Sequence, residues 1–321
     1  MSDLPKKVMI NEEGPREGFQ IEKTPIATDR KIALIDALSE TGVKHIQTVS
    51  FVNPKRVPGW ADADAVVQGQ HYNPKVEYTP LWLIPKGFER ALQYRDKLAL
   101  KGRVTVYASE TFMIRNQNTD DRQNLAMQRE QVTQYQAAGL PVTSVIVNAA
   151  FGCNFSGDIP DARVLEVLGW AFGVAAEFGE KPKRIRLADS MAWATPDRIK
   201  RTVGAVRNRY PDLAINMHLH DTRGMAIANA YAGLEMGVAD FDSAVAGLGG
   251  CPFAGHAGAA GNVCTEDLVF LCEEMGIETG IDLDKLIEVA RLAEDVVGRP
   301  LPGSVMHGGT LARFRQAAAA Q

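Results

Sequence analysis

Two histidines stand two residues apart at the end of a short apolar run: His218 and His220 follow Leu213-Ala214-Ile215. On an extended strand, side chains alternate between the two faces, so residues two apart point the same way. Imidazole is a common ligand of Zn, Fe, Ni and Mn, and two imidazoles on one face can share one ion. The motif predicts part of a metal site whose other ligands come from elsewhere in the chain. The rival interpretation is one buried and one solvated histidine near a strand end.

The elements that must position these histidines follow a regular alternation of short apolar runs and longer helical stretches, typical of repeated β-α units with parallel strands. Eight strands are predicted, over residues 7–11, 45–49, 76–83, 103–108, 142–147, 184–187, 214–218 and 240–245. Eight strand-helix pairs fit one (β/α)8 TIM barrel, which typically takes about 250 residues. We therefore predict a catalytic barrel over residues 1–275, and a C-terminal helical extension and tail packed on it over residues 276–321.

The alternative fold is a doubly wound open sheet. It would not explain why polar residues follow so many strands, and the first strand lacks the Gly-x-Gly-x-x-Gly of a dinucleotide site. In a barrel, the C-terminal ends of the strands converge on one mouth. The polar and thiol residues expected at that mouth are the segment 12–20 after the first strand, Asp189 after the sixth, the two histidines at the seventh, and Cys251 and Asn262 after the eighth.

Composition excludes several classes of protein. Hydrophobic residues make up 45% of the 321 residues and charged residues 23%, close to the average for a globular enzyme. The net charge of -4 gives no basic field for nucleic acid. No run approaches the roughly 18 apolar residues of a membrane span, and the chain start has no apolar signal core. The four cysteines are too scattered for a disulfide scaffold. We expect a cytoplasmic protein without membrane or nucleic-acid partners.

Four segments resemble the 3-hydroxy-3-methylglutaryl-CoA lyase family, within the larger group of metal-dependent barrel lyases and Claisen condensing enzymes. These segments are residues 14–20 with Glu22-Lys23, residues 48–55, residues 218–222, and residues 245–253 continuing through Gly261-Asn262 to Leu268. The last segment is the most specific. Together they spread from the first strand to the end of the barrel, so the resemblance covers nearly all of the chain before Gly303.

The resemblance implies a divalent cation held by Glu17, His218, His220 and Asn262. Oxygen and imidazole ligands suit Mg or Mn and also Zn, so the ligand types do not choose the metal. For Asn262, an ordinary helix cap before Thr265 is the competing interpretation. The resemblance also implies a small-molecule acyl-CoA substrate, and we expect a homo-oligomer.

The resemblance further assigns roles in the reaction. Arg16 lies on the thioester oxygen, Cys251 transfers a proton, and Asp189 lies near the substrate hydroxyl, where it acts as the base together with His218. Asp189 could instead cap the helix that begins near Thr195. The CoA part of the substrate is expected to meet Gln20, Lys23 and Ser50.

The implied reaction is a metal-dependent retro-Claisen cleavage of a 3-hydroxy-3-methylglutaryl-CoA-like thioester to acetyl-CoA, or an analogue, and a keto acid. The chain departs from the family at three points: Glu17 replaces an aspartate, Gln47 replaces an acid on the second strand, and the loop from Cys251 to Asn262, which contains His256, is two residues longer. Two alternatives therefore stay open: a condensing enzyme or aldolase that uses a keto acid, and a CoA-ligand-binding homologue without turnover.

Overall fold

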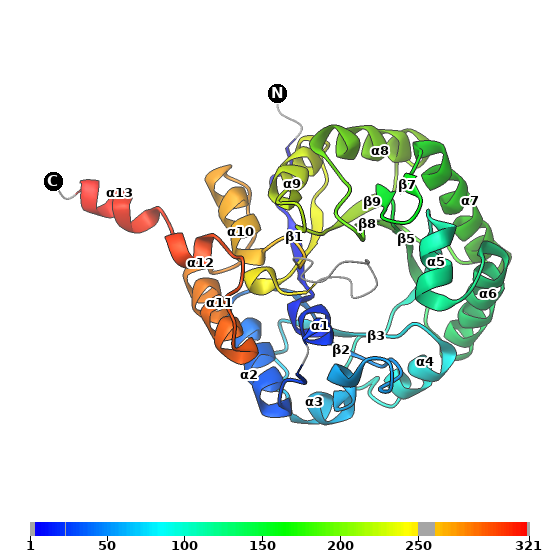
Figure 1. The fold of residues 1–321 in the computed structure, drawn as a ribbon, viewed down its shortest axis with the longest axis horizontal. Helices are drawn as coiled ribbons and strands as arrows, with labels where there is room; N and C mark the ends of the chain where they lie inside the picture. Colours follow the sequence, from blue (N-terminus) through cyan, green and yellow to red (C-terminus); the bar gives the residue numbers. More distant parts are fainter. Residues whose placement is uncertain (1–3, 23, 250–260, 320–321) are drawn as a thin grey trace.

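The computed structural model describes residues 4–22, 24–249 and 261–319. Eight parallel strands curl into a barrel with helices outside it (Figure 1). These strands are β1 (Met9–Glu12), β2 (His45–Ser50), β3 (Glu77–Leu81), β4 (Gly102–Tyr107), β5 (Val142–Asn148), β8 (Arg184–Asp189), β9 (Ala214–Leu219) and β10 (Asp240–Ser243). All eight predicted strands are present, and the predicted (β/α)8 fold class is confirmed.

The strands pair in the order β3-β2-β1-β10-β9-β8-β5-β4. Among the described residues no ladder joins β3 to β4, which are the two ends of this order. Their connection is instead made by single contacts: Ala99 N donates to the Tyr78 carbonyl at 2.8 Å, and Arg103 Nη2 donates to the Trp82 carbonyl at 2.6 Å. A short antiparallel pair, β6 (Gly152–Cys153) and β7 (Gly157–Asp158), follows β5.

Helices connect successive strands and cover the outside of the barrel (Figure 1). They are α2 (Thr28–Ser39), α3 (Ala63–Gly69), α4 (Pro85–Leu92), α5 (Glu110–Gln117), α6 (Asp121–Ala137), α7 (Asp161–Glu177), α8 (Pro196–Arg209), α9 (Ala226–Glu235) and α10 (Thr265–Glu274). Single turns precede them or close the strands: η1 (Gly14–Gly18), α1 (Phe19–Ile21), η2 (Pro58–Trp60) and η3 (Val245–Gly247). Within the described residues, no helix is both long and apolar enough to cross a membrane.

The C-terminal segment contains α11 (Leu283–Val297), α12 (Val305–Gly308) and α13 (Ala312–Ala319). Helix α11 packs against α2 and α10, whereas α13 extends away from the barrel (Figure 1). The predicted boundary between a barrel domain and an extension at residues 275 and 276 stays a prediction.

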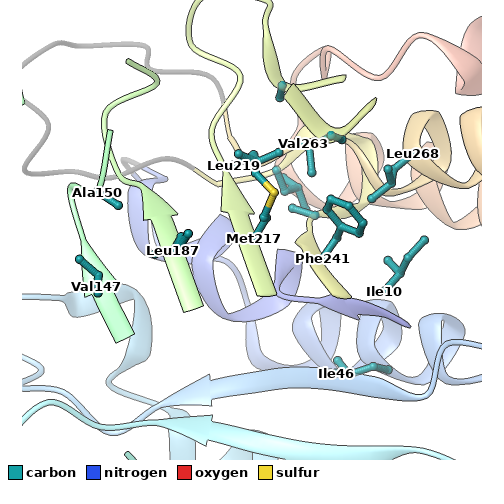
Figure 2. Packing of buried hydrophobic residues seen from close by; sticks show 14 of the residues in the cluster. Ile10, Ile46, Val147, Ala150, Leu187, Met217, Leu219, Phe241, Val263 and Leu268 are labelled. Atoms are coloured by element: carbon teal, nitrogen blue, oxygen red, sulfur yellow. The ribbon is translucent and has the colours of Figure 1, made fainter. Parts of the chain in front are cut away.

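The hydrophobic core lies between the sheet and the helices. Figure 2 shows Leu187, Met217 and Phe241 in this layer, all of them fully buried. Met217 and Leu219 alternate with His218 and His220 along β9, so the apolar pair packs outward while the imidazoles face the barrel interior. Burial of the apolar face therefore fixes the direction in which both histidines point.

The barrel interior is polar instead of being filled by the branched apolar side chains usual for this fold. A cavity of about 490 Å³, here called the lower cavity, opens at the end where the strands begin, and polar or charged side chains from most of the strands line it: Asn11, His45, Gln47, Thr79, Arg103, Ser144, Arg184, Arg186 and Asp240. A second cavity of about 190 Å³, here called the upper cavity, lies at the end where the strands finish, and His218 and His220 line it.

Candidate active site

The turn η1 follows β1 directly and has the π-helical form, which is rare and frequent at functional sites. The buried Glu12 anchors it. The Glu12 carboxylate accepts three hydrogen bonds, from Gly14 N at 2.7 Å, Val245 N at 3.0 Å and Thr265 Oγ1 at 2.7 Å. Burial raises the pKa of Glu12 to about 7. These contacts tie the turn to the segment after β10, and the buried Arg16 and Glu17 on the turn both line the upper cavity.

The two imidazoles have their outer nitrogens engaged. His220 Nδ1 lies 3.0 Å from the Ser190 carbonyl, which can only accept, so Nδ1 carries the proton. His218 Nδ1 lies 3.2 Å from an Asp242 carboxylate oxygen. Burial opposes ionisation of Asp242, but Arg186 and His218 outweigh it and hold the pKa of this carboxyl below its ordinary value. His218 Nδ1 therefore donates as well, and in the neutral rings both Nε2 atoms present lone pairs.

These lone pairs converge on Glu17. His218 Nε2 and His220 Nε2 lie 3.1 Å apart, and His220 Nε2 lies 3.0 Å from Glu17 Oε1. Burial would raise the pKa of Glu17, but Arg16 and the two imidazoles hold it well below its ordinary value, so the carboxylate is ionised. Burial would likewise lower the pKa of His218, yet Glu17 and Asp242 raise it. The three ligand atoms lie within 4.8 Å of one another and together favour a positive charge between them.

Asn262 lies beside this cluster. Its backbone pairs with His220 in an antiparallel bridge at the end of β9. A Cβ added to Gly249 would stand 3.2 Å from Glu17 Cγ and 3.7 Å from Asn262 Nδ2, which places both side chains around one point. Asn262 is 1% exposed, and neither its Oδ1 nor its Nδ2 has a hydrogen-bond partner among the described residues. The helix-cap alternative is wrong, because the N-cap of α10 is Cys264 and the Asn262 side chain accepts from no backbone N–H of the described residues.

The donor set fits a divalent cation. Buried polar atoms are normally hydrogen-bonded, so an orphaned amide beside two lone-pair nitrogens and an ionised carboxylate indicates a missing partner. Glu17, His218, His220 and Asn262 are thus the residues that could hold a metal ion, and all four were predicted from the sequence.

Arg16 is held in place by its neighbours. Its Nη2 pairs with Glu13 and lies 3.0 Å from Glu17 Oε2, and its Nε donates to Gln47 Oε1. Gln47 therefore acts as a neutral acceptor for Arg16. Glu13 in turn pairs with Arg186 at 2.7 Å. Burial opposes ionisation of Glu13, but Arg186 and Arg16 lower its pKa below the ordinary value.

Asp189 ends β8 and is 1% exposed. Its two carboxylate oxygens accept backbone hydrogen bonds from Trp193 N at 2.8 Å and Ala194 N at 3.0 Å. Burial raises the pKa of Asp189. The N-cap of α8 is Thr195, so Asp189 does not cap that helix but shapes the loop before it. The upper cavity is lined by Ala188 and Ser190 on either side of it, and the role of Asp189 as a base stays a prediction.

The residues predicted to meet CoA are only partly described. Gln20 lines the upper cavity. Ser50 ends β2, is fully buried, and its hydroxyl has no hydrogen-bond partner among the described residues. Lys23 and the proposed proton donor Cys251 lie outside the described residues, as does His256. Their assignments stay predictions.

Sequence reasoning missed the residues that orient the site. Asp242 and the Ser190 carbonyl fix the histidine tautomers, Glu13 and Arg186 balance charge beneath them, and Arg103 lines both cavities. A signal was present: Arg184 and Arg186 on β8, and Asp240 and Asp242 on β10, repeat with period two on strands that the fold required to be half buried.

The chain is similar to known proteins over most of its length. The HMGL-like family model matches residues 7–293. The hydroxymethylglutaryl-CoA lyase YngG of Bacillus subtilis is 38% identical over 298 residues, which cover 93% of this chain and 96% of that protein. The mitochondrial hydroxymethylglutaryl-CoA lyase of Homo sapiens is 38% identical over 307 residues, covering 95% and 90%. The structure of an HMG-CoA lyase from Acinetobacter baumannii, in complex with coenzyme A and 3-methylmalate, superposes with a TM-score of 0.85 at 36% identity and covers 95% of this chain and 96% of that one. The chain belongs to the HMGL-like family.

Proposed function

We propose that the protein is a divalent-metal-dependent carbon-carbon lyase that cleaves a 3-hydroxy-3-methylglutaryl-CoA-like thioester to acetyl-CoA and a keto acid. The observation that carries this proposal is the convergence of Glu17 with the Nε2 atoms of His218 and His220 beside the unpartnered amide of Asn262. The names of the two lyase relatives, each matching more than 90% of this chain, support the same reaction.

Glu17, His218, His220 and the Asn262 side chain would hold the cation. When bound, the cation supplies Lewis acidity that lowers the pKa of a substrate hydroxyl and helps to fix the substrate. Mixed oxygen and imidazole ligands suit Mg or Mn, with Zn as the alternative. His218 Nδ1 bonds Asp242 and His218 Nε2 faces the cation site, so we assign His218 to metal binding in preference to proton transfer.

Arg16 is the candidate for stabilising the thioester enolate. Its guanidinium is buried, lines the upper cavity, and is oriented by Glu13 and Gln47. A fixed donor aimed at developing negative charge contributes about 3 kcal/mol in acyl-transfer sites. Glu13 and Gln47 hold the Arg16 guanidinium in one position, so Arg16 need not reorganise during the reaction.

Two proton transfers remain to be assigned. Asp189 is our candidate base for the substrate hydroxyl, because burial raises its pKa and a carboxylate with a raised pKa accepts a proton more readily. Cys251 is our candidate donor to the enolate carbon. Gln20, Lys23 and Ser50 are the candidates for CoA contacts, and the coenzyme A bound in the Acinetobacter baumannii lyase supports an acyl-CoA substrate. The cytoplasmic location and the homo-oligomeric state stay predictions.

The test uses purified protein freed of metal with a chelator. With Mn or Mg restored, 3-hydroxy-3-methylglutaryl-CoA should release acetyl-CoA, detected by mass spectrometry, and His220→Gln should abolish this release. The matched control is His45→Gln, which alters another interior histidine at the opposite end of the barrel and should keep most of the activity. Turnover that is unaffected by chelation or by His220→Gln would overturn the proposal, as would ligand-induced stabilisation without any product.

A further inference from the structure

Arg103 is a cation of the barrel interior that has no matching anion among the described residues. It is the second residue of β4, and its guanidinium lines both the lower and the upper cavity. Its hydrogen bond to the Trp82 carbonyl and its position 4.4 Å from the centre of the Trp82 ring hold the side chain on one wall. Within the part of the chain that the structure describes, no carboxylate pairs with it.

The other two guanidinium groups of the upper cavity are already neutralised. Arg16 pairs with Glu13 and Glu17, and Arg186 pairs with Glu13 and Asp242. Burial and, to a lesser degree, the nearby Arg186 and Arg16 lower the pKa of Arg103, whereas Tyr135 and Glu13 act in the opposite direction. Arg103 is only partly buried, and a carboxylate that enters with the substrate would pair with it while displacing solvent, which strengthens the attraction between the two charges.

The position of Arg103 sets the length of that substrate. Strand register aligns Arg103 with Ser144 and Ser144 with Arg184, whereas His218 is aligned with Ala188. Arg103 thus starts four residues below His218, roughly 13 Å along the strand at about 3.3 Å per residue. Its side chain spans part of this separation. A short acid arm held at the metal cluster would leave Arg103 unpaired, and a longer arm would reach it.

Free volume lies on both sides of Arg103. Arg103, Ile146 and Arg186 line the upper cavity of about 190 Å³ and also the lower cavity of about 490 Å³, so these three side chains lie between the two spaces. The remaining lower lining includes neutral polar side chains such as Thr79 and Ser144, which can solvate a carboxylate. The carboxylates of that lining, Glu77 and Asp240, already pair with Lys101 and Arg184.

We propose that Arg103 binds the free carboxylate of the acyl group, and that the preferred acyl group carries this carboxylate on a longer arm than 3-hydroxy-3-methylglutaryl does. This inference rests on the proposed lyase function and names its substrate class: 3-hydroxyacyl-CoA thioesters with a terminal acid that extends towards the base of the barrel. The chemistry is otherwise unchanged. The hydroxyl loses its proton, the C2–C3 bond breaks, its electron pair becomes the thioester enolate, and a proton returns to C2.

The experiment compares the full-length, metal-loaded protein with three variants. The substrates are 3-hydroxy-3-methylglutaryl-CoA, 3-hydroxy-3-methyladipyl-CoA, and the terminal carboxamide of the latter. Wild type should cleave the adipyl thioester with a kcat/KM at least equal to that for the glutaryl thioester, and about 100-fold above that for the amide. Arg103→Gln should erase the difference between acid and amide, and Arg103→Lys should restore part of it. Lys101→Gln is the matched control, because Lys101 lines only the lower cavity and already pairs with Glu77.

The ratio of acid to amide is measured on one protein, so it does not depend on any loss of stability when the Trp82 contact is removed. An equal fall for acid and amide in Arg103→Gln, or a tenfold preference of wild type for the glutaryl thioester, would overturn the inference while leaving the lyase function intact. Failure of wild type to cleave any thioester would overturn the lyase function. Calorimetric binding of the keto acid product, 4-oxopentanoate, then tests Arg103 separately: loss of this binding in Arg103→Gln supports the subsite, and unchanged binding refutes it.

Discussion

Replacing Asp242 by asparagine should weaken metal binding without dismantling the barrel. The Asp242 carboxylate is fully buried and lies 3.2 Å from His218 Nδ1, where it fixes the proton so that Nε2 offers a lone pair. The same oxygen pairs with Arg186 at 2.7 Å. Asparagine keeps the shape and one acceptor but loses the charge that makes the imidazole a stronger ligand.

The expected magnitude follows from these contacts. Loss of a residue that orients a metal-ligating histidine typically costs 10- to 100-fold in metal affinity. Because Asp242 divides its charge between His218 and Arg186, we expect the lower half of this range, about 10- to 30-fold, or about 1.4 to 2 kcal/mol. Titration of metal-free protein with Mn²⁺, followed by the electron paramagnetic resonance signal of the free ion, measures this change directly.

The control for this variant is Asp240→Asn. Asp240 lies two residues earlier on β10, faces the same interior and pairs with Arg184, but it makes no contact with either histidine. Asp240→Asn should change Mn²⁺ affinity less than twofold. Equal weakening by both variants would show that general interior charge, and not the tautomer of His218, governs the site. An unchanged affinity in Asp242→Asn would refute the reasoning outright.

Three further predictions concern other parts of the barrel. Burial lowers the pKa of His45 from 6.5 to about 4, so between these pH values the unfolded chain binds more protons than the folded chain. The free energy of unfolding should therefore fall by up to about 3 kcal/mol as the pH drops from 6.5 to 4. In urea unfolding measured at a series of pH values, His45→Gln should flatten this dependence, and an unchanged slope would contradict the assignment. Glu17→Asp should lower Mn²⁺ affinity at least tenfold, because the shorter side chain withdraws the carboxylate from His220 Nε2, which lies 3.0 Å from Glu17 Oε1. Equal or tighter Mn²⁺ binding in the titration would show that the turn η1 adapts freely. Glu12→Ala leaves Gly14 N and Val245 N without their acceptor, so the free energy of unfolding in urea should fall by at least about 3 kcal/mol. A loss below about 1 kcal/mol would mean that water or a backbone shift replaces the carboxylate.

The sequence alone determined the fold, and the resemblance of four segments to a known family predicted the metal-ligand set. The strands read as short apolar runs because their outward faces must pack under helices, and the His218-x-His220 spacing then required both imidazoles to face inward. Barrel topology brings the ends of all strands together, so Glu17, the two histidines and Asn262 could be grouped although more than 240 residues separate the first from the last.

Only the tertiary structure decided which groups surround these ligands. The tautomers of His218 and His220 depend on the Asp242 carboxylate and the Ser190 carbonyl, which approach from the neighbouring strands on either side. Arg103 reads in sequence as an ordinary charged residue at a strand start, and its lack of a partner becomes visible only when every interior carboxylate is placed. Hydrophobic periodicity is a local property of the chain, whereas charge compensation inside a barrel depends on side chains from many strands at once. That difference explains why the ligands were predicted and their electrostatic surroundings were not.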